Sequence, residues 1–257
     1  MGRTGGIMVS VTARVNAVKQ PRGGYINPAV MKCQQLDDGS SLGEESISPS
    51  TMGMVVDYMT RFTVSGDAKK SFRISISGAI RGNYLDKAIG YLNKVVGDDD
   101  VSIQNACRLV WYDTILRTGK IPSGSPEDIH ADAATCENVR IMVGRSLKFF
   151  EAFGPVVADG IGFPGGYSKV VNSGDGDFVT KDTLWDFKVS KNPPTKENTL
   201  QLAMYYIMAK RSICDWAHGL DKIGIFNPRL NRVYILEMGT VSQEVIESIK
   251  HDVLCYD

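Results

Sequence analysis

Two aspartates and a lysine lie close together in the stretch GDGDFVTKDTLWDFKVSK, residues 174–191. Asp177 falls on one predicted strand, and Asp186 and Lys188 fall on the next, with a tight turn between the two strands. Two carboxylates that approach each other across such a hairpin repel one another unless a cation neutralises them. A hard divalent ion such as magnesium prefers oxygen ligands of this kind, and a lysine beside the ion could position or deprotonate a water. The residues therefore indicate hydrolysis of a phosphodiester bond.

The same stretch also has a plainer interpretation. Side chains alternate between the two faces of a β-strand, so Trp185 and Phe187 would point to the core while Asp186 and Lys188 point to solvent. An ordinary hairpin that carries an Asp–Lys pair on its surface has the same pattern. Under both interpretations we expect Trp185 and Phe187 to be buried.

The next predicted helix carries a second pair of polar groups. Gln201 and Tyr205 are four residues apart in TKENTLQLAMYYIMAKR, so they share one helical face. Gln201 interrupts an apolar run, and a buried amide needs a hydrogen-bonding partner. An active-site metal shell or a nucleic-acid backbone could supply that partner, although a tyrosine at such a position more often packs in the core.

Three elements occur in order: G-x-x-D (Gly174 to Asp177), D-x-K (Asp186 and Lys188) and Q-x-x-x-Y (Gln201 and Tyr205). This order resembles the RecB-like branch of the PD-(D/E)XK nuclease superfamily. That branch contains metal-dependent DNA nucleases, many of them exonucleases of recombination, repair or phage origin. The matching region covers roughly residues 160–211. The resemblance implies a restriction-endonuclease-like core, DNA as the partner, and nuclease activity, most specifically that of an exonuclease.

The resemblance also implies a role for each residue of the motifs. Asp177 and Asp186 would bind one or two magnesium or manganese ions, with the backbone carbonyl of Phe187 as a further ligand. Lys188 would act on the water and the transition state. The last two residues, Gln201 and Tyr205, would organise the site and the DNA backbone, as members of the catalytic set.

Lysines near these motifs are candidates for contacts with the nucleic acid. Lys191 and Lys196 follow Lys188 closely and could track a phosphate backbone. Lysines beside a helix are most often only a solvated face, so this interpretation depends on the resemblance.

The family usually adds a histidine or glutamate from an upstream helix, and here the sequence departs from the pattern. Asp86 and Glu151 are the upstream candidates, and neither matches the family motif well. This departure leaves a second function open, a catalytically weak or inactive nuclease-fold module that binds nucleic acid. The five cysteines are scattered without a C-x-x-C pair, so we expect no iron–sulfur cluster.

The 257 residues predict a single α/β or α+β domain in which helices flank a mixed sheet. We expect an N-terminal extension over 1–47, a mostly helical part over 48–153, and the catalytic sheet with its flanking helices over 154–257. Helices are predicted from residue 48, at 84–96, 101–116, 134–153 and 196–211, and from residue 242. Strands are predicted at 72–77, 169–172, 177–180, 183–190, 222–226 and 232–238.

Charge and hydropathy limit the class of protein. The chain has 29 basic and 29 acidic residues, so any affinity for nucleic acid must come from a local basic surface. No segment reaches the roughly 20 apolar residues of a membrane span, and no secretory signal is evident. We therefore expect a cytoplasmic protein with reduced cysteines and no membrane partner. The resemblance is compatible with a homo-oligomer, but the sequence does not specify an oligomeric state.

Overall fold

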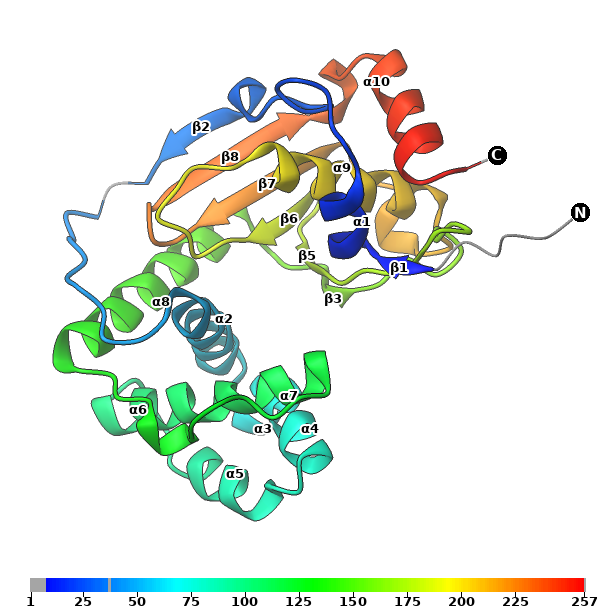
Figure 1. Ribbon diagram of the computed structural model, residues 1–257. Helices are drawn as coiled ribbons and strands as arrows, with labels where there is room; N and C mark the ends of the chain where they lie inside the picture. The colour runs from blue at the N-terminus through cyan, green and yellow to red at the C-terminus, as the bar shows by residue number, and fades with distance from the viewer. Residues whose placement is uncertain (1–7, 37, 257) are drawn as a thin grey trace, which may run out of the picture.

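The computed structural model describes residues 8–36 and 38–256, and it is a mixed α/β structure (Figure 1). A six-stranded sheet and a group of helices form its two main parts. The long helix α8 (Ala133–Phe153) runs from the helical part to the sheet. The predicted class, in which helices flank a mixed sheet, is confirmed.

The six-stranded sheet has the strand order β2-β8-β7-β6-β5-β3. Its strands are β2 (Lys32–Gln35), β3 (Ala158–Ile161), β5 (Gly176–Val179), β6 (Thr183–Phe187), β7 (Lys222–Asn227) and β8 (Arg232–Glu237). Only β6 and β7 are parallel within this sheet, and helix α9 (Lys196–Arg211) connects them. A smaller parallel sheet pairs β1 (Val9–Ser10) with β4 (Val171–Ser173).

The other helices are short, apart from α2. They are α1 (Val11–Ala17), α2 (Pro49–Ser65), α3 (Ala68–Ser71), α4 (Arg73–Arg81), α5 (Leu85–Leu92), α6 (Asp100–Leu109), α7 (Asp113–Thr118) and α10 (Gln243–Ser248), which continues as a π-helical turn over Ile249–Val253. The predicted start of α2 is confirmed, because the Ser48 side chain accepts the backbone N–H of Thr51 as an N-cap. The boundaries predicted for α9 are also confirmed.

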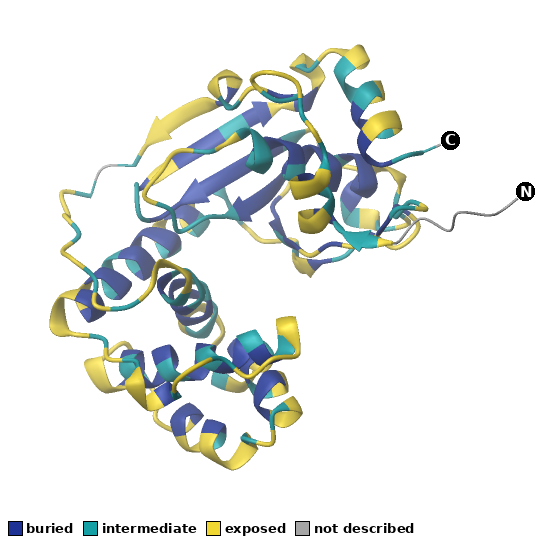
Figure 2. Cartoon of the chain, in the orientation of Figure 1, coloured by how far each residue is buried: buried dark blue, intermediate teal, exposed yellow. Residues whose placement is uncertain are grey.

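Both faces of the central sheet are covered, and this positions the residues of β5 and β6. Val179 and Leu184 belong to the core that α9 completes on one face. Phe178 and Trp185 point to the other face, where they pack against Phe149 of α8. Figure 2 shows the buried residues running along β6, β7 and α9. The expectation of one solvated face is therefore wrong for this strand, because α9 covers the face that carries the polar residues.

Trp185 lies directly over Gly224 of the neighbouring strand. The two residues pair across β6 and β7, and a Cβ atom added at Gly224 would lie 2.3 Å from the indole ring. The indole N–H donates a hydrogen bond to Oγ1 of Thr180 at 2.9 Å, so the buried polar atom is satisfied. Trp185 is 1% exposed, as expected, whereas Phe187 is only half-buried.

The strand predicted at 72–77 is wrong, because this segment is helical. Phe72 caps α4, and the buried residues of the segment are Phe72, Ser75 and Ala79, which follow helical spacing. Gly78 lets this helix approach the backbone of Tyr112, since a Cβ at Gly78 would lie 2.0 Å from that carbonyl oxygen. The alternation of FRISIS is therefore a local coincidence that tertiary packing overrides.

Two other expectations differ from the structure. The helix predicted at 101–116 is interrupted by a 3₁₀ turn over Val110–Tyr112, which separates α6 from α7. Strands β2 and β3 are absent from the sequence prediction. All four residues of β2 are exposed, and β3 contains Gly160 with a φ of +58°, so neither strand has the regular alternation of a half-buried strand.

Buried ion pairs attach the irregular segment before α2 to the rest of the structure. Glu45 pairs with Arg229 at 2.6 Å, and both side chains are almost fully buried. Arg145 of α8 pairs with Asp38 at 2.7 Å and also donates to backbone carbonyls of the β7–β8 turn. The described part of residues 1–47 is thus integrated into the fold, because β2 also forms an edge of the main sheet.

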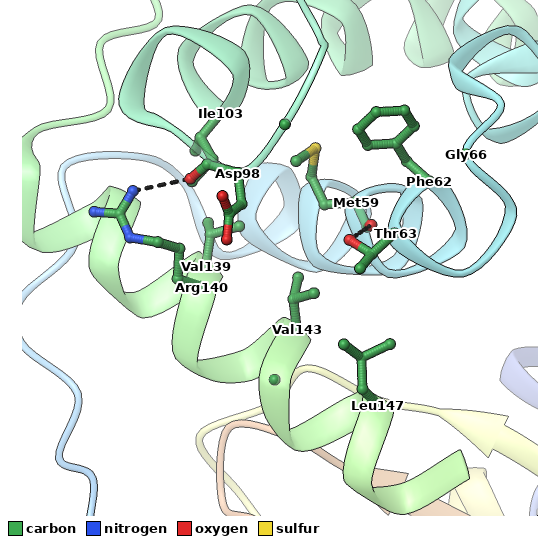
Figure 3. Close-up of a pocket in the computed structure, with 12 residues that line it drawn as sticks. Met59, Phe62, Thr63, Gly66, Asp98, Ile103, Val139, Arg140, Val143 and Leu147 are labelled. Atoms are coloured by element: carbon green, nitrogen blue, oxygen red, sulfur yellow. Dashed lines mark hydrogen bonds between the residues drawn. The ribbon is translucent and has the colours of Figure 1, made fainter. Parts of the chain in front are cut away.

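A groove of about 430 Å³ lies in the helical part, between α2 and α8 (Figure 3). Its walls are mainly apolar, with Met59 and Phe62 on one side and Val143 and Leu147 on the other. None of the residues predicted for the active site lines it. Across the described parts of the chain, no helix is both long enough and apolar enough to span a membrane.

The covering of Trp185 yields a stability prediction. We expect Trp185→Ala to lower the free energy of unfolding by about 3 to 5 kcal/mol, because it opens a cavity over Gly224 and removes aromatic contacts. Phe187→Ala should cost clearly less, since Phe187 is only half-buried. Urea denaturation followed by circular dichroism measures both values. Equal losses for the two variants would contradict this account of the core.

Candidate active site

The β5–β6 hairpin brings Asp177 and Asp186 together. Phe178 and Trp185 are paired across the two strands and point to the α8 face, so the adjoining Asp177 and Asp186 point to the α9 face. Oδ2 of Asp177 accepts the backbone N–H of Phe187 at 2.6 Å, which links the end of one strand to the other. The predicted approach of the two acids is therefore present in the structure.

Asp186 is buried, with 5% of its surface exposed. Its Oδ1 lies 3.1 Å from Nζ of Lys188, which follows the end of β6 because the strand predicted over 183–190 ends at Phe187. Its Oδ2 is also buried and has no hydrogen-bond partner among the described residues. A buried carboxylate oxygen that lacks a partner is costly, so this atom marks a position where a cation or another donor would be stabilising.

The charges of these groups act strongly on one another. Burial and the neighbouring Asp186 and Asp57 raise the pKa of Asp177 to about 8. Burial opposes the charge of Lys188, but Asp186 and Asp177 outweigh it and raise the lysine pKa. Lys188 is therefore an ammonium ion at neutral pH, suited to orient a water or stabilise negative charge and not to act as a base in this state.

Gln201 and Tyr205 contact each other on the α9 face. Nε2 of Gln201 donates to the Tyr205 hydroxyl at 3.0 Å, so the partner expected for the glutamine is the tyrosine. Burial raises the pKa of Tyr205, and the charges of Asp186 and Asp177 add to this effect. The neutral phenol thus lies within the field of both carboxylates and keeps its own O–H as a donor.

Close packing around Gly174, the first residue of the G-x-x-D motif, leaves no room for a side chain. A Cβ atom there would lie 2.7 Å from Cγ2 of Val11 and 3.0 Å from Cε1 of Tyr205. The backbone before β5 therefore passes tightly against the tyrosine ring. Phe163 stacks on Tyr205, with ring centroids 5.1 Å apart. These contacts set the position of the phenol relative to the hairpin.

A further acid, Asp57 of α2, lies beside this group and was missed in the sequence. Its charge contributes to the raised pKa of Asp177. Oδ1 of Asp57 pairs with Nε of Arg61 at 2.8 Å, and Nη1 of the same arginine binds Asp159 of β3 at 2.5 Å. Burial raises the pKa of Asp57, although the arginine opposes this shift. The signal in the sequence was an acid within the apolar run MVVDYM, with an arginine four residues later.

A buried polar cluster holds α2 in this position. The carboxylate of Asp113 on α7 is fully buried and accepts hydrogen bonds from Tyr58 of α2 and Ser75 of α4, each at 2.5 Å. Tyr58 is the residue next to Asp57. The cluster therefore ties together three helices directly behind the acid that faces the sheet.

The structure does not bring the two upstream candidates of the sequence to the site. Asp86 is exposed in the first turn of α5, which packs against α4 and α6 in the helical part (Figure 1). Glu151 is exposed in the last turn of α8, the helix that covers the opposite face of the sheet. Asp57 is the upstream acid whose charge reaches Asp177.

The predicted nucleic-acid contacts lie beyond the end of β6. Lys191 is exposed in the loop that follows the strand, and Lys196 is the first residue of α9 and is partly buried. Both remain predictions as DNA contacts, and so does the role of the Phe187 carbonyl as a ligand.

The fit of a divalent ion depends on the Asp177 and Asp186 pair. The described residues contain no group of three or more histidine, cysteine, aspartate or glutamate side chains placed to hold a metal ion. The carboxylate pair nevertheless provides hard oxygen donors, an unpartnered buried oxygen and a mutual repulsion that a cation would relieve. The residues thus suit magnesium or manganese by their chemistry.

Comparison of the chain with protein-family models, with curated proteins and with solved structures finds no match.

The raised pKa of Asp177 predicts a pH dependence of stability in protein kept free of divalent ions. Its folded pKa of about 8 exceeds its ordinary value of 3.8, so its stabilising contribution is complete below the ordinary value and is lost as pH rises through the folded value. Asp177→Asn removes this loss. We expect the variant to gain stability relative to wild type as the pH rises from about 4 to about 8 in urea denaturation with a chelator.

Asp182 provides a matched control at the opposite end of β6. Lys222 and Thr183 lower its pKa despite the opposing effect of burial, so Asp182→Asn should lose stability relative to wild type as the pH rises from acid values. A difference between wild type and Asp177→Asn that stays constant over the range would show that Asp177 ionises normally.

Proposed function

We propose that this protein is a metal-dependent DNA nuclease that hydrolyses phosphodiester bonds, and more specifically an exonuclease. The observation that carries the proposal is the group of Asp177, Asp186 and Lys188, in which Asp186 is buried and the other two are partly buried, with Gln201 and Tyr205 beside it. The order of these residues resembles the RecB-like nucleases, and a mixed sheet flanked by helices is compatible with the restriction-endonuclease-like core that the resemblance implies.

Asp177 and Asp186 would hold one or two magnesium or manganese ions, and Asp57 takes the upstream acidic position that Asp86 and Glu151 do not fill. A bound divalent ion supplies Lewis-acid activation of water and neutralises charge on the phosphate. In the overall reaction, the oxygen of a water bonds to phosphorus, the bond from phosphorus to the leaving oxygen breaks, and the leaving alkoxide takes up a proton.

The residues of the chain have separate tasks in this reaction. The ammonium of Lys188, held 3.1 Å from Asp186, can orient the water and offset the negative charge that develops on the phosphate. Tyr205 can donate its O–H to a phosphate oxygen, because its hydroxyl already accepts the bond from Gln201. Burial of Asp186 and Tyr205 limits the access of water to these two groups and strengthens their electrostatic effect.

One observation favours the second candidate, a nuclease-fold module that binds nucleic acid without turnover. Asp57 is paired with Arg61, and a carboxylate held by a guanidinium is less available to a metal ion. The two candidates share the site and the partner, and they differ in whether DNA is cut.

The cleavage assay distinguishes them. Purified protein is incubated with linear and circular DNA in magnesium or manganese, beside Asp186→Ala and Lys188→Ala variants. We expect each variant to lose at least about 100-fold in rate, because each removes a charged group from the reacting centre. Cutting of linear DNA alone would indicate an exonuclease.

The controls for this assay are Asp182→Ala and Lys222→Ala. These residues form another Asp–Lys pair on β6 and β7, 2.7 Å apart, at the other end of the strands. Both controls should retain the wild-type rate. Activity that survives in Asp186→Ala and Lys188→Ala would sink the assignment of the site, and wild-type protein that binds DNA without cutting it would favour the second candidate.

A separate comparison identifies the upstream acid. We expect Asp57→Asn to reduce the cleavage rate at least about tenfold, since its charge acts directly on Asp177. Asp86→Asn and Glu151→Gln should stay within about twofold of wild type, as exposed substitutions usually do. Rates are measured on linear DNA over a range of magnesium concentrations. A loss in either exposed variant, with Asp57→Asn unaffected, would show that the assignment of Asp57 is wrong.

A further inference from the structure

Six exposed basic side chains come from α3, α4 and the end of α7. We call them the basic surface; they are Lys69, Lys70, Arg73, Arg81, Arg117 and Lys120. Within residues 8–36 and 38–256, Lys69, Lys70, Arg73 and Lys120 have no ion-pair partner. Asp67, the N-cap of α3, offsets part of this charge, and Asp113 is buried, so the surface remains positive because its basic residues outnumber these acids. A chain with no net charge thus concentrates positive charge here.

The fold brings these residues together from three helices. Lys69 and Lys70 lie in the last turn of α3, and Arg73 is the first residue of α4, with Phe72 alone between the two helices. Arg81 at the end of α4 donates to the carbonyl of Leu116, which joins α4 to the end of α7. Figure 1 shows α3, α4 and α7 packed together.

The basic surface is continuous with the candidate active site. Arg73 reaches β3, where its Nη2 would lie 3.3 Å from a Cβ atom added at Gly160. The adjoining Asp159 binds Arg61, which in turn binds Asp57. At the other end, the charge of Asp175, in the turn before β5, acts on Arg117. Partial burial lowers the pKa of Arg117, but Tyr58, Asp113 and Asp175 together outweigh it and raise this pKa.

These contacts place the basic surface beside the acidic residues of the candidate active site. Carboxylates that hold a metal ion repel an approaching polyanion when they are ionised, so a substrate rich in phosphates needs a compensating attraction nearby. Neutralising backbone phosphates with lysine and arginine releases counterions and supplies most sequence-independent affinity for nucleic acid. Unpaired and exposed cations are suited to this task, because no protein partner must be displaced.

We propose that the basic surface binds the phosphate backbone of DNA next to the scissile bond, so that the substrate extends from the sheet across α3, α4 and the end of α7. This inference rests on the proposed nuclease function. It deepens that function by assigning the helical part to substrate binding.

The test compares two triple variants that remove the same charge. Lys69→Gln, Lys70→Gln and Lys120→Gln are combined in the surface variant. Lys94→Gln, Lys148→Gln and Lys181→Gln are combined in the control, and these lysines are also exposed without ion-pair partners in the described chain, but lie outside the basic surface. Exposed lysines without partners can be neutralised with little effect on folding, which thermal unfolding verifies.

Binding to a labelled linear DNA duplex is measured by fluorescence anisotropy with a chelator present, so that turnover plays no part. We expect the surface variant to bind at least about tenfold more weakly, with a salt dependence of log Kd reduced by about 2 to 3. The control variant should bind within about twofold of wild type. Equal binding by all three proteins, or an equal loss in both variants, would overturn the proposal.

A vesicle arm separates DNA from the other large polyanion that a basic surface attracts. The same proteins are sedimented with vesicles that contain phosphatidylserine. A loss of vesicle binding in the surface variant, without a loss of DNA binding, would also overturn the proposal. If DNA binding depends on the basic surface but no DNA is cut, the nuclease function is refuted and the proposal for the basic surface is supported. If DNA is cut but its binding does not depend on the basic surface, the nuclease function is supported and the proposal for the basic surface is refuted.

Discussion

Asp177 and Asp186 lie on the same face of the hairpin, one partly and the other almost fully shielded from water, and much of the structure serves to keep them there. The hairpin aligns them, the Phe187 N–H fixes one carboxylate, and Lys188 partly neutralises the other. Helix α9 closes the face above them and adds Tyr205 to the same field. The arrangement costs stability in the absence of a counterion, because burial and the charge of Asp186 oppose ionisation of Asp177. Proteins tend to retain such a cost at sites that do chemistry.

The helical part completes this electrostatic arrangement from outside the sheet. The Asp113 cluster secures α2 by Tyr58, and the preceding residue, Asp57, acts on the hairpin through its charge. Arg61 joins that acid to Asp159 on the edge strand β3. The helices therefore do more than cover the sheet, since Asp57 and Arg61 of α2 extend the group of charged residues that begins on β5 and β6.

The local parts of the site could be predicted from the sequence because their spacing follows the periods of strand and helix. Asp186 lies on β6 and Lys188 follows the end of that strand, where its backbone N–H still bonds to Phe226 of β7, and Gln201 and Tyr205 are four apart on a helix, so each pair shares a face. Asp57 could not be found in this way, because it meets Asp177 by tertiary packing between segments far apart in the chain. Burial of Asp186 was also beyond a local pattern, since α9 and not the strand decides it. The alternation at 72–77 predicted a strand where the structure has a helix for the same reason, since the close packing of Gly78 against Tyr112 is a tertiary contact that a local pattern does not contain.

The stacking of Trp185 on Gly224 has a consequence for how this sheet can evolve. Any side chain at position 224 would collide with the indole, and any smaller residue at position 185 would leave a void over the glycine. A substitution at either position alone lowers stability, so the two residues should change together in evolution. A distant relative that lacks the tryptophan should carry a larger residue on the adjoining strand, and the two sites should covary across the hydrogen-bonded register.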